Sequence, residues 1–205
     1  DVGTNGRVSD GGVWNKCSLS QSIEDGVISL PPPKRPPSVS DSVSGLTKEV
    51  RHVFVGDDAF ALKTHMMKPY PKNGFSADKR IYNYRHRRAR KVSETLVGIM
   101  PNRWRVFYTI LMLPPETIEL LVIAALILHN YLRHHSFSSP NAYCTTQLID
   151  REDRRSKIID GNWRQDLPPT ESFLPLLVPS KGHNASNDAK NVRDTFKSTS
   201  TMKVQ

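Results

Sequence analysis

Residues 53–60, VFVGDDAF, decide the fold, because an apolar run ends here abruptly at Gly56, Asp57 and Asp58. Contiguous apolar residues are typical of a strand buried on both faces, and they predict a strand over residues 50–55. The glycine allows the chain to turn at the end of that strand. Open α/β sheets place their ligand groups just beyond the strand ends, so we expect Asp57 to point into a crevice.

Two interpretations of Asp57 follow from this position. A carboxylate after a strand often serves only as a turn or cap residue. It also suits Mg²⁺ or Mn²⁺, which take a few carboxylates together with water and substrate phosphates. Asp58 is predicted to be a turn or helix-start residue, with metal ligation as its alternative. A complete metal site needs further carboxylates from elsewhere in the chain.

A basic helical run that is closed by Glu94 supplies the next candidate. Helical spacing of apolar residues predicts a helix over residues 76–100 that begins at Ser76 and is stopped by Pro101. Glu94 follows a run without acids and shares roughly one helix face with the basic residues three, four and seven positions before it. We therefore predict that Glu94 is a metal ligand and that the basic run binds DNA phosphates. The run comprises Lys79, Arg80, Arg85, Arg87, Arg88, Arg90 and Lys91.

Alternatives for this helix stay open. Glu94 also suits a surface ion pair with Arg90 or Lys91, which contributes at most about 1 kcal/mol. The basic run also suits a solvated helix face, although seven cations repel one another unless a polyanion or an acidic neighbour answers them.

The remaining segments are predicted from their glycine and proline residues and from their apolar patterns. A helix is predicted through VWNKCSLSQSIEDG and ends at Gly26, and residues 30–45 form a proline-rich loop. Residues 104–113 are expected to be a short strand or extended, and residues 116–134 a helix so apolar that it must be buried. His129 on that helix is predicted to be a buried, hydrogen-bonded histidine. Residues 136–205 form a polar extension whose last 20 to 25 residues are expected to be disordered.

Composition indicates which kind of partner the chain binds and in which cellular compartment it works. The 205 residues are 37% hydrophobic and carry 29 Lys and Arg against 20 Asp and Glu, a formal charge of +9. This excess favours a polyanion, with DNA first. Cys17 and Cys144 suggest no disulfide framework, which fits the nucleus or the cytosol. The longest apolar run, residues 120–128, is short of the roughly 20 residues of a membrane span, so no membrane is expected.

Four strings in unbroken order resemble the catalytic domain of PIF/Harbinger-type DDE transposases: DVGTNGRVSDGGVWNKCSLS, VFVGDDAFALKTHMMKPYP, NYRHRRARKVSETLVGIMPNRWRVF and LPPETIELLVIAALILHNYL. We expect a partial domain over residues 1–135, since the resemblance covers residues 1 to about 134. The resemblance implies an α/β fold in which an RNase H-like mixed sheet is flanked by helices. It also implies a domain that cuts DNA with three acids and Mg²⁺ or Mn²⁺. Asp57 matches the second acid and Glu94 the third. The family often uses a separate Myb-like DNA-binding partner, and its work on DNA implies the nucleus.

Departures from the family pattern produce two hypotheses. The family's first Asp lies on a strand upstream of DVG, so we expect a sheet incomplete at its N-terminus. The usual VxENAFGI around the third acid reads VSETLVGI here, with Thr95 in place of the Asn and Val97 in place of the aromatic residue. The first hypothesis is a nuclease in which metal activates water and then a 3′ hydroxyl for in-line attack on a DNA phosphodiester. The second is a domesticated or decayed nuclear module that binds DNA or protein without cutting.

Overall fold

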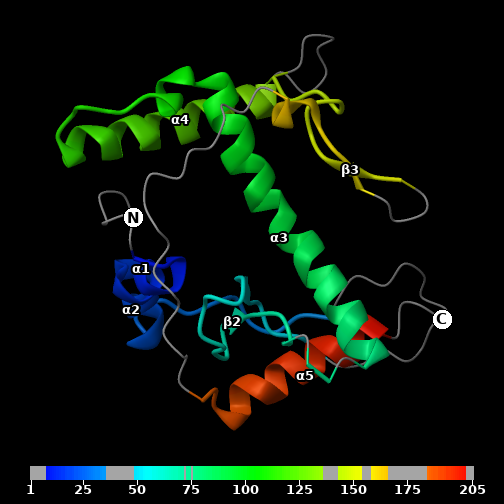
Figure 1. The fold of residues 1–205 in the computed structure, drawn as a ribbon. Coiled ribbons are helices and arrows are strands. Elements are labelled where there is room, and N and C mark those ends of the chain that lie inside the picture. The colour runs from blue at the N-terminus through cyan, green and yellow to red at the C-terminus, as the bar shows by residue number, and fades with distance from the viewer. Residues whose placement is uncertain are drawn as a thin grey trace. The chain divides into compact units, whose positions relative to one another are not determined.

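A computed structural model describes most of the chain (Figure 1). The chain divides into two compact units. The Asp57 unit comprises residues 6–90 and 176–205, and the Glu94 unit comprises residues 1–5 and 91–175. The described residues are 8–35, 49–71, 73–74, 76–135, 143–153, 158–165 and 184–201, without the side chains of 200 and 201.

Two short helices open the Asp57 unit where one helix was predicted. They are α1 (Asp10–Lys16) and α2 (Ser18–Glu24). Cys17 separates them because its backbone is extended, and its Sγ accepts the N–H of Ser20 as the N-cap of α2. The chain turns where the sequence predicted, since Gly26 has a φ of 71°.

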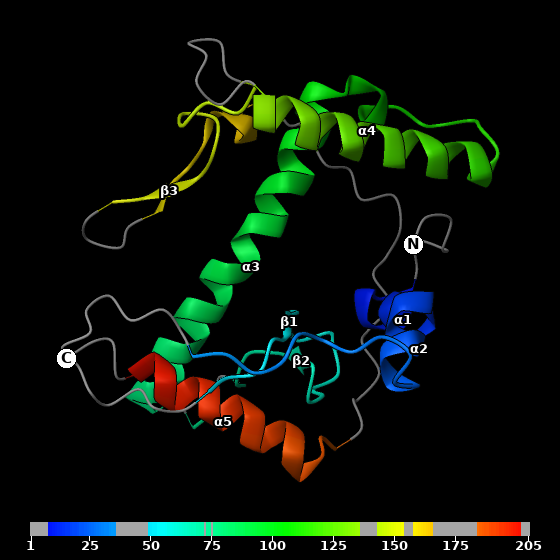
Figure 2. The same ribbon diagram turned by 180° about the vertical axis from the view of Figure 1, so that it is seen from behind.

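The predicted strand 50–55 is present only at its end, as β1 (Phe54–Val55) (Figure 2). It pairs in parallel with β2 (Met66–Met67), with Phe54 opposite Met66 and Val55 opposite Met67. Val50 instead makes an isolated antiparallel bridge with Lys34. β1 is only partly covered, because Val55 is 38% exposed, so the expected burial on both faces is wrong for this strand. Most of the predicted proline-rich loop, residues 36–45, lies outside the described residues.

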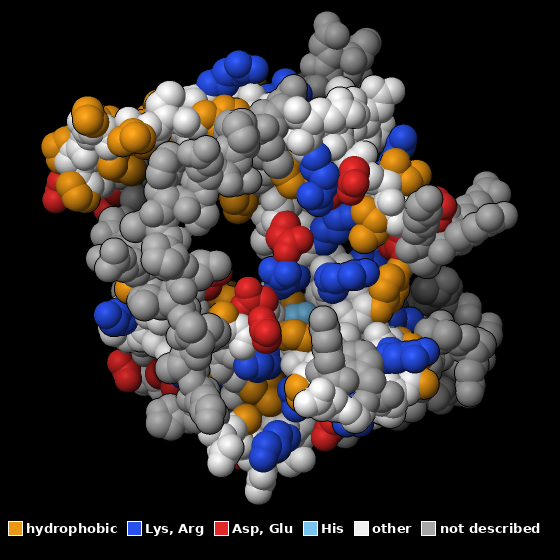
Figure 3. Space-filling model, viewed as in Figure 1, with side chains coloured by type: hydrophobic (Ala, Val, Ile, Leu, Met, Phe, Trp, Pro, Cys, Tyr) orange, Lys and Arg blue, Asp and Glu red, His pale blue; other side chains and the backbone are white. Residues whose placement is uncertain are grey.

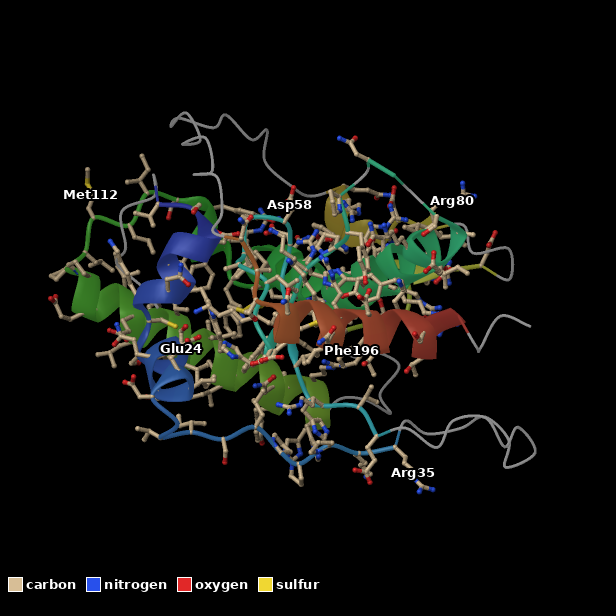
Figure 4. All side chains as sticks on the ribbon, turned by 90° about the horizontal axis from the view of Figure 1, so that it is seen from below. Glu24, Arg35, Asp58, Arg80, Met112 and Phe196 are labelled. Atoms are coloured by element: carbon tan, nitrogen blue, oxygen red, sulfur yellow. The ribbon has the colours of Figure 1, made fainter. Side chains whose placement is uncertain are left out.

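The predicted disorder of the last residues is wrong for residues 187–201, which form α5 (Asn187–Thr201). Ala189 on α5 is fully buried and packs with Leu62 and Met67 in a core that also includes Val192 and Phe196 (Figure 4). These three α5 positions share one helix face, so an otherwise polar segment gains enough apolar contact to fold. Residues 202–205 lie outside the described residues.

The predicted basic helix is α3 (Ala77–Arg103), whose residues 77–90 belong to the Asp57 unit and 91–103 to the Glu94 unit. It begins where predicted, because the carbonyl oxygen of Ser76 accepts the N–H of Arg80 at 3.1 Å. Pro101 does not stop it, which corrects the predicted end. A proline this close to the end removes one hydrogen bond, and the helix closes with Trp104 N–H donating to Met100 at 2.8 Å.

Beyond α3, the Glu94 unit contains short elements around α4 (Pro115–His135). Residues 104–113, expected to be a short strand or extended, instead begin with a 3₁₀ turn, η1 (Arg105–Tyr108). Beyond it Thr109 is extended, and residues 109–113 belong to no helix or strand. A hairpin of β3 (Arg151–Glu152) and β4 (Ile158–Ile159) leads into η2 (Asn162–Arg164). Helices thus combine with strands as expected, but the sheets among the described residues are two-stranded.

The prediction that α4 must be buried is wrong. Ala125 and His129 are buried, whereas Leu120 is 68% and Ile127 62% exposed. α4 packs by one face only, so its nearly all-round apolar composition leaves the opposite face at the surface. By length and composition alone, α4 is also the one helix of the described residues that is able to cross a membrane. The core helix of a soluble protein meets the same criteria of length and composition.

Candidate functional site

Asp57 lies directly after β1 in a tight turn of the Asp57 unit. Gly56 extends the ladder by donating its N–H to the carbonyl of Met67 at 2.9 Å. The Oδ1 of half-buried Asp57 accepts the N–H of Ala59 at 2.9 Å. A Cβ on Gly56 would lie 2.7 Å from the ring of Phe60, so the turn requires glycine there. The turn interpretation of Asp57 is therefore confirmed locally, and one backbone hydrogen bond is compatible with metal ligation.

Asp58 is exposed and belongs to the same turn (Figure 4). Its contribution comes from the backbone, since its carbonyl oxygen accepts a hydrogen bond from Lys68 Nζ at 2.7 Å. This agrees with the predicted turn role.

His86, which was not among the predicted site residues, links α3 to this turn. Its buried ring nitrogen Nε2 donates to the carbonyl of Met67 at 3.2 Å, and the same oxygen accepts the N–H of Gly56. Burial lowers the pKa of His86, and the charge of Arg90 lowers it further, while the Met67 hydrogen bond and the charge of Asp57 oppose both. A sequence signal for His86 was present in YNYRHRRAR, because this histidine lies one helical turn after Tyr82, which is buried.

Asn83 on α3 has a structural role. Its side chain accepts the N–H of Tyr70 at 2.8 Å and donates to the carbonyl of Tyr70 at 2.9 Å. Both backbone groups of one residue are thus satisfied by one amide, which fixes the segment after β2 against α3.

The basic residues of α3 differ in exposure. Arg80, Arg87 and Arg88 are exposed, whereas Lys79, Arg85, Arg90 and Lys91 are half-buried. Figure 3 shows Lys and Arg side chains along α3 with a few acidic side chains among them. The exposed three offer the most accessible charge for a polyanion.

In the Glu94 unit, the carboxylate of Asp150 forms an ion pair with Lys91 of the basic run. The buried carboxylate of Asp150 lies 3.4 Å from Lys91 Nζ and 2.7 Å from a terminal nitrogen of Arg164. It also accepts the N–H groups of Gly161 at 2.7 Å and of the Trp163 indole at 3.2 Å. Burial alone would raise the pKa of Asp150, but the hydrogen bonds from Arg164 and Gly161 and the charges of Arg164 and Lys91 lower it to about 2. Asp150 is therefore ionised and holds the segment around η2 against α3.

Glu94 is exposed on α3 beside this cluster. The pKa of Arg164 is raised first by its hydrogen bond to Asp150, and the charges of Asp150, Asp160 and Glu94 add to this effect. Glu94 thus lies within the electrostatic reach of a guanidinium that already binds another carboxylate.

Close packing places η2 on α3 one turn beyond Glu94. A Cβ on Gly98 would lie 2.2 Å from the ring of Trp163, so only glycine leaves room for that indole. Asn102 Nδ2 donates to the carbonyl of Trp163 at 2.9 Å. His129 is buried and lies 3.2 Å, Nδ1 to hydroxyl, from Tyr143, which confirms the prediction for this histidine.

Asp57 and Glu94 belong to different units, and each is described within its own. Among the described residues, no three His, Cys, Asp or Glu side chains gather closely enough to hold a metal ion.

Comparison with known proteins places these features in a family. Residues 1–130 match the family model described as DDE superfamily endonuclease. A stretch of 85 residues, 41% of this chain, is 26% identical to "Protein ALP1-like" of Arabidopsis thaliana and spans only 21% of that relative's length. No solved structure matches the chain. The family match covers well over half of the sequence and includes both Asp57 and Glu94, so the chain belongs to the DDE superfamily endonucleases.

Proposed function

We propose that this chain is part of a Harbinger-type, transposase-derived DNA endonuclease domain with an RNase H-like fold. Asp57 is assigned as the second acidic metal ligand and Glu94 as the third. The observation that carries the proposal is the family match over residues 1–130, which contains both acids in the expected order. The position of Asp57 in the turn directly after β1 supports it.

The chemistry of the two acids suits Mg²⁺ or Mn²⁺, since both ions prefer carboxylate oxygens. The described residues nevertheless do not assemble a group of three ligands. When bound between acids, such a metal would supply charge stabilisation for phosphodiester cleavage. With two assigned ligands the set is incomplete, so we expect the 205-residue chain to bind DNA without cutting it.

DNA contact is assigned to Arg80, Arg85, Arg87, Arg88, Arg90 and Lys91 of α3. Such side chains contact the phosphate backbone of DNA, and the resulting affinity falls steeply as the salt concentration increases. Arg80, Arg87 and Arg88 carry most of the contact because they are exposed, whereas Lys91 lies 3.4 Å from Asp150. We place the protein in the nucleus and suggest a Myb-like protein as the partner that provides sequence recognition.

A second candidate function is a nuclear module that binds DNA or protein but has lost cleavage. The contacts around Glu94 favour it, because Arg164 lies within its electrostatic reach and a cation there competes with a metal for the carboxylate.

Two assays on the purified chain separate these functions. Fluorescence anisotropy with labelled duplex DNA should give binding that falls with salt, and Arg87→Gln with Arg88→Gln should weaken it about tenfold and reduce the salt slope by about two. The exposed pair Lys16→Gln with Arg51→Gln, outside α3, is the charge-matched control. Equal weakening by both pairs would remove the assignment to α3.

Incubation of supercoiled plasmid with Mn²⁺ then tests cleavage. Nicking by the 205-residue chain that Asp57→Asn and Glu94→Gln each abolish would establish an active endonuclease and refute our expectation of an incomplete set. Nicking that survives both substitutions would refute the site assignment.

A further inference from the structure

The exposed face of α4 has a regular apolar seam. Leu120 is 68%, Ile123 44%, Ile127 62% and Tyr131 57% exposed, and their spacing of three and four residues places them along one side of the helix. In Figure 3 hydrophobic side chains reach the surface near the start of α4, where Met112 in the preceding loop is 92% exposed (Figure 4). Soluble monomers rarely leave such a contiguous seam uncovered.

The orientation of this seam is fixed by the opposite face of α4. Ala125 and His129 are buried there, and His129 Nδ1 lies 3.2 Å from the hydroxyl of Tyr143. Rotating α4 to bury the seam would expose this packed face and break that contact. The seam is therefore a surface of the Glu94 unit and needs a partner from outside it.

Charge at the two ends of α4 selects the partner. The first turn carries Glu116 with Glu119 close behind, and the last turn carries Arg133, His134 and His135. The helix macrodipole adds to the same polarity. An antiparallel copy of α4 is thus complementary at both ends, whereas a parallel copy brings like charges together.

The seam is also self-complementary in register. Ile123 and Ile127 lie two residues on either side of Ala125, and Glu116 and His134 lie nine residues on either side. A two-fold axis at the level of Ala125 therefore places Ile123 against Ile127 of the second copy and Glu116 against His134. Such isologous contacts are the commonest way in which identical chains pair.

We propose that the α4 seam binds the α4 seam of a second copy of this chain in an antiparallel pair. A bilayer is the less favoured occupant, because the same helix exposes the polar side chains of Glu116, Glu119, Asn130 and Arg133. The proposal is independent of metal binding and cleavage.

Sedimentation velocity of the intact 205-residue chain over a range of concentrations tests the pair. A monomer–dimer equilibrium is expected, and Ile127→Asp should weaken it at least tenfold by placing a carboxylate in the seam. Val97→Asp is the matched control, because Val97 is 69% exposed on α3 and outside the seam. Circular dichroism and thermal unfolding establish that each variant folds.

Charge exchange tests the antiparallel orientation and does not alter the apolar seam. Glu116→Lys should weaken the dimer, and Glu116→Lys combined with His134→Glu, the position it faces across the two-fold axis, should restore it. A chain that stays monomeric at all concentrations would overturn the proposal, as would a dimer equally weakened by Val97→Asp. Sedimentation of monomers with phosphatidylcholine and phosphatidylserine vesicles, lost in Ile127→Asp, would assign the seam to a membrane instead.

Discussion

The buried imidazole of His86 donates from Nε2 to the backbone carbonyl of Met67 at 3.2 Å, and this contact links helix α3 to the β1–β2 pair. The carbonyl of Met67 also accepts Gly56 N–H at 2.9 Å, one residue before Asp57. The position of a proposed metal ligand is thus supported by a side chain from another element.

Replacing His86 tests this support. His86→Ala removes the hydrogen bond and leaves a cavity, so it should lower the free energy of unfolding by about 2 kcal/mol. The neighbouring exposed Arg87→Ala should change it by less than about 0.5 kcal/mol. Urea unfolding followed by circular dichroism measures both, and equal effects would show that His86 has no special part.

The stability of the Asp57 unit should depend on pH through His86. The folded-state pKa of this histidine is lowered by burial, so the folded state binds its proton less readily than the unfolded state. Its contribution is fully present above the unfolded value of about 6.5 and is lost as pH falls towards the folded pKa. The stability difference between the wild-type chain and His86→Ala should therefore shrink between pH 7.5 and pH 5. A difference that is constant or grows over this range would contradict the assignment.

Asp150 should be the most sensitive charged residue of the Glu94 unit. Asp150→Asn leaves Lys91 and Arg164 facing a neutral amide and should cost about 2 kcal/mol, since a lowering of the pKa to about 2 corresponds to that size. Because this pKa is lowered, the contribution is present above the unfolded value of about 4 and is lost as pH falls towards 2. Thermal unfolding at pH 7 compares the variant with Asp25→Asn, an exposed acid. Equal melting temperatures would refute the role of Asp150.

Gly98 should tolerate no side chain. Gly98→Ala places a methyl group 2.2 Å from the ring of Trp163, so η2 must leave α3 and the indole must become exposed. Tryptophan fluorescence should shift to longer wavelength, whereas Val97→Ala at the neighbouring exposed position should leave it unchanged. An unshifted spectrum for Gly98→Ala would show that Trp163 does not pack there.

Local signals in the sequence predicted where helices begin, but they could not predict which faces of those helices are buried. The helices α3 and α4 begin at Ala77 and Pro115, each within one residue of the predicted starts at 76 and 116, because capping and proline geometry act over a few residues. Whether α4 is buried depends on packing by distant segments, and its apolar composition alone gave the wrong answer. The helix in the polar tail had a weak local signal, since Ala189, Val192 and Phe196 follow a helical spacing.

The candidate site was likewise predictable only where local sequence determines it. The turn at Asp57 was predictable from Gly56 and the apolar run before it, because both act locally. The pairing of Lys91 with Asp150 joins residues about 60 positions apart, and no local pattern specifies such a partner. The assignment of metal ligation to Asp57 and Glu94 stays a prediction of the family resemblance.

The most direct measurement of the central claim is Mn²⁺ titration of the intact 205-residue chain, followed by paramagnetic broadening of its backbone amide signals. We expect broadening at Ala59 and Phe60, lost in Asp57→Asn, and broadening around Glu94, lost in Glu94→Gln, with Asp25→Asn unchanged. Broadening that survives both substitutions, or that centres on other acids, would contradict the assignment of Asp57 and Glu94 as metal ligands.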